Sequence, residues 1–466
     1  MQASLDRIAA LNPLLVAFCD MRPEAAMDEA RAAESAVLRG DDLPTLHGLP
    51  IGIKDMNDVA GLRTTYGSHL YKDNVAATDE FIVAHLRKQG AIVVGKTNIP
   101  ELGFGATSSN TLWGTTCNPH DPRFTAAGSS GGTAVALASG MVPLAMGSDF
   151  AGSLRTPASF NGITGIRPSA GTVANERRAF GFSPFNVEGP MGREAQDARL
   201  LLAAMAGPQS FDPLSQRRDP GFDAPGLPDL SRLRIAVSED LGFCPIDNGV
   251  RATFRARMAR MATFFHATDE ACPDLSSVER VLQVMRSLEF LHDFKAIYDR
   301  DKASLAPNVV YEVERALTLG IPDAAWALGE HARIHRAAQA FFDRYDLLFT
   351  PAASVPPFRH EDEWPRQING QPMANYLQWE AIAYGVTLMG NPAVVIPCGK
   401  GPDGLPFGLQ IVGPLHRDAW LADVAVVLEA LFAREPDLCR PMIDLPALIR
   451  AAADKKQEPQ QERTST

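Results

Sequence analysis

Short apolar segments and helix-forming segments alternate along most of this sequence, and this alternation constrains the fold more than any other feature. Runs such as 50–54, 91–94 and 234–237 are apolar or β-branched, as buried strands are, whereas 23–38 and 419–433 have the spacing of amphipathic helices. Such alternation predicts an α/β fold, with helices on both faces of a mainly parallel or mixed central sheet. Further strands are expected at 144–147, 346–350, 393–396 and 407–412, and further helices at 80–88 and 130–141.

We expect one domain over residues 1–453. Its core is expected to comprise 47–205 and 345–450, with a variable, mostly helical cap over about 231–344. Residues 208–230 are rich in Pro, Asp and Gly, which predicts a surface connection. The tail 454–466 contains no apolar residue and is predicted to be disordered.

Composition narrows the classes of partner. The 466 residues carry a formal net charge of −11, and an acidic surface argues against nucleic acid. Six scattered cysteines without a C-x-x-C pair predict reduced thiols in a cytoplasmic protein. Neither a secretory signal nor a run of about 18 apolar residues is visible, so no membrane contact is expected. The expected partner is a small molecule, and a homodimer is left open.

Two glycine- and serine-rich turns carry the chemical information. The run GSSGG, which contains Ser129 and Ser130, leads directly into a helix of small residues. The run DFAGS, which ends at Ser153, lies between an expected strand and an expected helix. At such a turn, successive backbone N–H groups point outward and can hold a developing oxyanion. Serines at a helix start also serve as N-caps, so this pattern alone does not assign a role.

A serine hydroxyl needs a base before it can act as a nucleophile. No histidine lies near these turns in sequence except His120, although a more distant histidine stays open. The other candidate is Lys54, which ends an apolar strand where an idle lysine is out of place. A lysine acts as a base only when neutral, and burial lowers its pKa from about 10.4 by up to about 3–5 units.

Several motifs in consistent order resemble the amidase signature family. They are GLPIGIKD, VVGKTNIPELGFG, GSSGGTAVALASG, GSDFAGSLRTPASFNGITGIRPS and EGPMGREAQDA, and the later GNPAVVIPCGKGPDGLPFGLQIVGP is similar to that family's C-terminal sheet motif. The resemblance is dense over residues 47–169, returns over 390–414, and is weak between them. It implies the amidase-signature fold and hydrolysis of the C–N bond of a small carboxamide, without metal or other cofactor.

The resemblance also implies roles by position. Lys54 matches the family's catalytic lysine, and Ser129 matches its bridging serine, which follows a cis peptide bond. Ser153 matches the serine that forms the acyl-enzyme. The implied oxyanion hole consists of the backbone N–H groups of Phe150, Ala151, Gly152 and Ser153, and the implied supporting residues are Ser130, Asp149 and Arg155.

The sequence departs from the family pattern at two places near Ser153. Ala151 stands where glycine is usual, which would strain the backbone by about 1 kcal/mol or more if the position needs a positive φ. Ser148 stands where threonine is common. Neither change alters the implied reaction class, and the sequence does not specify the substrate.

Alternatives to this function stay open from the sequence alone. The resemblance also allows the amidase subunit of a multi-subunit amidotransferase, or a hydrolytic deaminase acting on a catabolic intermediate. A non-catalytic protein on the same scaffold is disfavoured by the intact Lys54, Ser129 and Ser153. Residues 90–97 fit the phosphate-loop pattern, but their apolar centre predicts a strand instead. His331 and His335 have a spacing that can bind zinc, yet a solvated helix face is the preferred interpretation.

Overall fold

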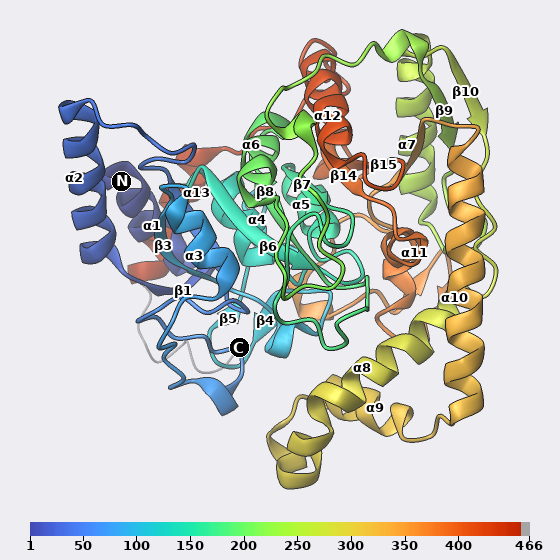
Figure 1. Ribbon diagram of the computed structural model, residues 1–466, viewed down its shortest axis with the longest axis horizontal. Coiled ribbons are helices and arrows are strands. Elements are labelled where there is room, and N and C mark those ends of the chain that lie inside the picture. Colours follow the sequence, from blue (N-terminus) through green and yellow to red (C-terminus); the bar gives the residue numbers. More distant parts are fainter. Residues whose placement is uncertain (458–466) are drawn as a thin grey trace.

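A mixed sheet of 11 strands runs through the molecule, as the alternating sequence pattern predicts (Figure 1). The computed structural model describes residues 1–457. Parallel pairs such as β2–β3 and β2–β6 coexist with antiparallel pairs such as β6–β8 and β14–β15. In spatial order the strands are β1 (Phe18–Met21), β3 (Ile92–Thr97), β2 (Pro50–Lys54), β6 (Leu144–Asp149), β8 (Val187–Gly192), β7 (Thr164–Arg167), β14 (Ala393–Lys400), β15 (Pro406–Val412), β11 (Leu347–Pro351), β9 (Arg234–Val237) and β10 (Ala267–Glu270).

Helices cover both faces of this sheet. One face carries α4 and α5, which contact each other, and the other carries α6 and α12, which also contact each other. The helices are α1 (Gln2–Leu15), α2 (Pro23–Arg39), α3 (Phe81–Lys88), α4 (Gly131–Ala138), α5 (Arg155–Asn161), α6 (Ala195–Met205), α7 (Asn248–Met261), α8 (Val278–Asp301), α9 (Pro307–Ala316), α10 (Ile321–Phe342), α11 (Ala381–Met389), α12 (Asp418–Phe432) and α13 (Leu445–Gln457).

Alternation along β6 explains how one strand serves two cores. Leu144 and Met146 belong to the apolar cluster on the α6 and α12 side, whereas Ala145 belongs to the cluster that contains α4. Successive side chains of a strand point to opposite faces, so a strand buried on both sides is apolar throughout. Helix α4 lies close to the backbone of the segment before β1 because the helix begins with glycines. A Cβ at Gly132 would lie 2.6 Å from the backbone oxygen of Ala17.

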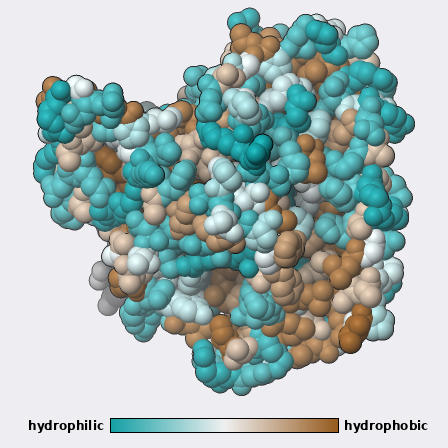
Figure 2. Space-filling model, viewed as in Figure 1, coloured by the Kyte–Doolittle hydropathy of each residue, from teal (hydrophilic) through white to brown (hydrophobic). Residues whose placement is uncertain are grey.

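The segment expected to form a cap contributes four helices, α7 to α10, and two strands. Helices α8, α9 and α10 pack together through contacts of α8 with both α9 and α10, and α8 and α10 also contact α11 (Figure 1). Strands β9 and β10 lie within the same segment and extend the central sheet beyond β11. Figure 2 shows hydrophobic residues over the surface of helices α8 to α10, where Tyr311, Leu317 and Ile321 are exposed.

The prediction of a disordered tail is wrong for its first residues. Helix α13 continues to Gln457 and therefore includes positions 454–457, while 458–466 lie outside the described residues. Leu448 and Ala452 are buried and belong to the same apolar cluster as residues of α1, which α13 contacts. This packing stabilises a helix whose last turn is too polar to predict one. Within residues 1–457, no helix is long and apolar enough to span a bilayer.

Candidate active site

Lys54 ends β2 with its ammonium group buried among hydroxyl and carbonyl oxygens. Its side chain is 0% exposed, and Nζ donates to Ser129 Oγ at 2.7 Å. Nζ also lies 3.0 Å from Ser148 Oγ and 3.3 Å from Ser148 O. Burial lowers the pKa of Lys54 to about 8, although the carboxylates of Glu188 and Asp149 act in the opposite direction. A substantial neutral fraction is therefore present near neutral pH, as a lysine base requires.

Ser129 and Ser130 face different parts of the site. The Gly128–Ser129 peptide bond is cis, as the family resemblance implies, and Ser129 Oγ points to Lys54. Ser130 instead links the two turns, because its N–H donates to Ser153 O at 3.2 Å and its hydroxyl to Ser148 O at 3.3 Å. The double-serine run thus supplies one hydroxyl next to the lysine and one structural connection to the turn that contains Ser153.

The turn after β6 is organised by the buried carboxylate of Asp149. It accepts hydrogen bonds from the N–H groups of Gly152 at 2.9 Å and Leu154 at 3.2 Å. The N–H of Gly152, one of the predicted oxyanion donors, is thus engaged by Asp149 in this structure. The N–H groups of Phe150, Ala151 and Ser153 have no such partner within the described residues.

Two buried arginines hold Asp149 in place. Arg155 binds both carboxylate oxygens at 3.0 Å, and Arg167 binds Asp149 O at 2.6 Å and Oδ1 at 3.1 Å. These cations, together with the N–H donors, keep the pKa of Asp149 well below its usual range despite the burial that would raise it. Arg155 in turn donates to Gln410 Oε1 and to the carbonyl of Ala383, both at 2.7 Å, so the turn is tied to β15 and α11.

Backbone geometry separates the two positions before Ser153. Gly152 has φ 127°, whereas Ala151 is not among the residues with positive φ. A Cβ at Gly152 would lie 2.6 Å from Ala383 Cβ and 3.1 Å from Glu380 Oε2. Glycine is thus required at 152, and the alanine at 151 is accommodated without backbone strain.

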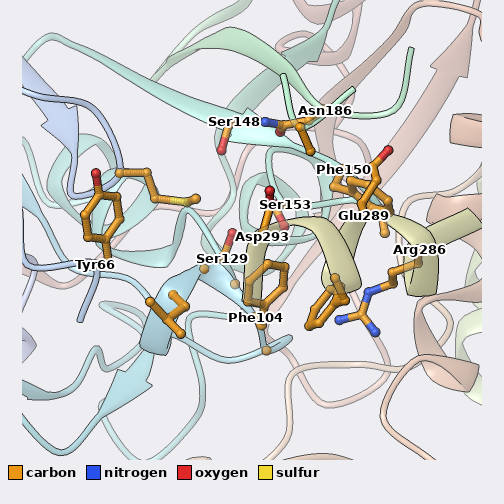
Figure 3. Close-up of a pocket in the computed structure, with 18 of the residues that line it drawn as sticks. Tyr66, Phe104, Ser129, Ser148, Phe150, Ser153, Asn186, Arg286, Glu289 and Asp293 are labelled. Atoms are coloured by element: carbon orange, nitrogen blue, oxygen red, sulfur yellow. The ribbon is translucent and has the colours of Figure 1, made fainter. Parts of the chain in front are cut away.

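A cavity of about 230 Å³ opens over these turns and is lined by Ser129, Ser148 and Ser153 (Figure 3). Much of its wall is aromatic, formed by Tyr66, Phe104, Phe150, Phe290 and Tyr376. The hydroxyl of Ser153 makes no hydrogen bond to any described residue, so it is not joined to Ser129 although both line the cavity. The structure therefore brings Lys54 and Ser129 into contact and gives Ser153 an unengaged hydroxyl at the same cavity.

Comparison with known proteins identifies the family. A family model for amidases matches residues 1–421. The chain belongs to the amidase signature family. The amidase is 31% identical over 439 residues to an acylamidase of Rhodococcus erythropolis, with 92% of this chain and 91% of that protein covered. It is also 31% identical over 453 residues to the A subunit of the glutamyl-tRNA(Gln) amidotransferase of Symbiobacterium thermophilum, with 91% of each chain covered.

Solved structures agree with this assignment. One solved structure matches with a TM-score of 0.85 and 26% identity, over 94% of this chain and 95% of that one. It was reported in work on a vestigial protein complex and the evolutionary origins of an s-triazine catabolic enzyme. Family membership over nearly the whole chain makes this protein an amide C–N hydrolase. It also confirms the mixed α/β fold expected from the sequence.

The phosphate-loop pattern and the histidine pair both have structural roles in the amidase. Residues 92–97 form β3, and the buried Nζ of Lys96 lies 3.1 Å from Asp55 Oδ1 and 2.9 Å from Thr64 Oγ1. His335 Nδ1 lies 2.8 Å from Met389 O, and the His331 ring packs against Phe185. Lys96 is thus a structural lysine, and both histidines of α10 are in structural contacts.

Three contributors to the site were missed from the sequence. Ser148 was treated as a minor change, yet both of its oxygens contact the Lys54 ammonium. Arg167 and Gln410 anchor the 149–155 turn from β7 and β15. The signal for Arg167 was a charged residue that ends an otherwise uncharged strand, TGIR, much as Lys54 ends β2.

Proposed function

We propose that this amidase hydrolyses a small carboxamide through an acyl-enzyme on Ser153, with Ser129 and Lys54 as the proton relay. The observation that carries the proposal is the 2.7 Å contact between Lys54 Nζ and Ser129 Oγ in a fully buried setting, beside a cavity that Ser153 also lines. The lowered pKa of Lys54, about 8, supplies the neutral amine that a relay needs.

In the first half-reaction, Ser153 Oγ attacks the amide carbonyl as its proton passes to Ser129, whose own proton moves to neutral Lys54. The oxyanion is held by backbone N–H groups of Phe150, Ala151 and Ser153. When the tetrahedral intermediate collapses, the C–N bond breaks and the relay returns a proton to the leaving ammonia or amine. Water then attacks the ester by the same route and releases the acid.

Replacing the nucleophile tests this mechanism. We expect Ser153→Ala to lose at least about 10³-fold in kcat, because the covalent route disappears, while the unfolding temperature stays unchanged. A serine-directed phosphonofluoridate should label the native enzyme at Ser153 and leave Ser153→Ala unlabelled. Labelling at another serine, or an active Ser153→Ala variant, would show that the nucleophile is assigned wrongly.

A second candidate function is the amidase component of an amidotransferase, favoured by the similarity to the A subunit of the glutamyl-tRNA(Gln) enzyme. That function needs partner subunits, so purification of the tagged chain from its own cells should recover them in stoichiometric amounts. A chain that purifies alone and hydrolyses simple amides would exclude it. A cytoplasmic location is part of the first proposal, and the six free cysteines support it.

A further inference from the structure

The charged side chains around the cavity are strongly unbalanced. Five carboxyl groups line it but only two basic side chains, both arginines, and neither lysine nor histidine belongs to the described lining. The acids are Glu80, Glu188, Glu289, Asp293 and Glu380, and the arginines are Arg177 and Arg286. What the cavity can bind depends on which of these charges are already paired.

Both arginines are engaged within the protein. Arg177 forms ion pairs with Glu80, at 3.1 Å, and with Asp58. Arg286 forms a buried ion pair with Glu312 and also donates to the Tyr376 hydroxyl. Neither guanidinium is left to receive an anionic substrate group, because each already has a carboxylate partner.

Within residues 1–457, Glu188, Glu289 and Glu380 have no ion-pair partner, and Asp293 has only His292, whose Nε2 lies 4.0 Å from its Oδ1. Glu188 and Glu380 are 5% and 6% exposed, and each has one carboxyl oxygen, Oε2 and Oε1 respectively, with no hydrogen-bond partner. Buried polar atoms are almost always hydrogen-bonded, so unpaired oxygens lining a cavity indicate positions that a ligand satisfies.

Helix α8 contributes an acidic pair to the cavity. Glu289 and Asp293 are one helical turn apart, and Figure 3 places both at the cavity with Ser153. Burial raises the pKa of Glu289 to about 7, and the nearby Asp293 acts in the same direction. The aromatic rings of Phe290, from the same helix, and Phe104 lie 4.2 Å apart between their centroids and line the same wall. The Arg286 guanidinium already lies over Phe290 and Phe104, 4.4 and 5.7 Å from their ring centroids, so the acidic pair rather than these rings would hold an organic cation.

We propose that the substrate is an amide that carries a positively charged group, ammonium or amidinium, seated at the acidic pair Glu289 and Asp293. The inference rests on the proposed function, because the scissile amide must lie at Ser153. A substrate carboxylate, such as the α-carboxylate of glutamine, would meet unpaired acids and no free cation. The same charge pattern therefore disfavours use of glutamine as the ammonia donor.

Three para-substituted benzamides test the charge preference. They are 4-(aminomethyl)benzamide, 4-methylbenzamide and 4-carbamoylbenzoate, whose para groups are cationic, neutral and anionic at pH 7. With ammonia release as the assay, we expect kcat/KM for the cation to exceed that for the neutral amide about tenfold and that for the anion about 100-fold, since each factor of ten corresponds to one modest charge interaction.

Two variants of helix α8 provide the matched comparison. The double change Glu289→Gln and Asp293→Asn should lower the cation-to-neutral ratio of kcat/KM at least about fivefold, because it removes the negative charge that the pair carries at pH 7, where Glu289 is about half ionised. Asp299→Asn removes a charge from the same helix at an exposed position that pairs with Lys295, and it should leave the ratio unchanged. Equal loss of the ratio in both variants would mean that the net charge of the helix, rather than the cavity, sets the preference.

Binding to the Ser153→Ala variant extends the test beyond turnover. Isothermal titration calorimetry should show tighter binding of 4-(aminomethyl)benzamide than of 4-carbamoylbenzoate. Equal affinity, or tighter binding of the anion, overturns the inference whether or not either compound is hydrolysed. If the neutral benzamide is hydrolysed and Ser153 is labelled but the cation has no advantage, the charge preference fails and the proposed function stands. If Ser153 is neither labelled nor required, the proposed function itself fails.

Discussion

Changing Glu188 to glutamine should shift the pH dependence of this amidase toward lower pH. Lys54 has a pKa of about 8, and the Glu188 carboxylate is the first of the groups that oppose its further lowering. Glu188 itself has a pKa raised to about 8 by burial, with Glu80 adding to the effect and Lys54 opposing it. The two groups titrate as a pair, so removing the acid removes a group that stabilises the positive charge of the lysine.

The size of the effect follows from the neutral fraction of Lys54. With a pKa of about 8, about one-tenth of the lysine is neutral at pH 7, against about one part in 3000 at its ordinary value of 10.5. We therefore expect kcat/KM of the native enzyme to rise about tenfold from pH 7 to a plateau above pH 9. In Glu188→Gln the rise should occur at lower pH, and activity at pH 7 should be a larger fraction of the plateau.

The assay is ammonia release from one neutral amide over pH 5.5–10, with each variant normalised to its own plateau. Normalisation removes any change in substrate binding that Glu188→Gln causes. Glu314→Gln serves as the control, because Glu314 is an exposed carboxylate of α9 paired with Lys302. A rise in activity that stays at the same pH in Glu188→Gln, or that moves to higher pH, would refute the argument that a neutral Lys54, electrostatically coupled to Glu188, governs the rate.

Three further changes have outcomes that the geometry fixes. Gly152→Ala should lower kcat at least about 100-fold, because the left-handed φ costs about 1–2 kcal/mol and the new Cβ meets Ala383 at 2.6 Å, while Ala151→Gly should retain activity within a few-fold. Lys54→Met should abolish activity yet raise the free energy of unfolding at pH 7 by up to about 3 kcal/mol. The pKa of Lys54 is lower in the folded state than in the unfolded state, so burying the charged lysine costs most below pH 8. The gain in stability should therefore fade as the pH rises from 8 to 10.5. Urea unfolding at pH 7 and 10 measures both limits. Arg155→Met should destabilise by about 3–5 kcal/mol in the same assay, because the buried Asp149 loses a charge partner, and a smaller loss than about 1 kcal/mol would contradict that account.

Much of the sheet could be predicted from sequence because its strands are apolar on both faces. Residues 50–54 and 234–237 form strands with the predicted bounds, whereas β3 and β6 extend beyond them, to Thr97 and Asp149. The extensions carry polar residues that pair with neighbouring strands, and single-sequence hydrophobicity does not reveal such pairing. Lys96 is an example, because it lies within β3 but beyond the predicted end of that strand at residue 94.

In the candidate site, too, residues within short sequence motifs could be predicted, whereas contacts that form only in the folded protein could not. The serine turns and Lys54 were recognisable because motif order and spacing identify them. The sequence did not reveal that the N–H of Gly152 binds Asp149, because this hydrogen bond depends on the position of a side chain three residues away. The acids of the cavity wall were also missed. Glu188, Glu289 and Glu380 come from separate elements, so only the fold brings them to one cavity.

The sheet order has a consequence for how such enzymes diversify. Lys54 ends β2 and the turn that contains Ser153 follows β6, whereas the acidic pair stands on α8, in a segment that joins the sheet beyond β11 through β9 and β10. Mutations on α8 can therefore alter ligand selectivity without disturbing the Asp149 network. Laboratory evolution aimed at new amides should concentrate its libraries on α8 and leave residues 128–155 untouched.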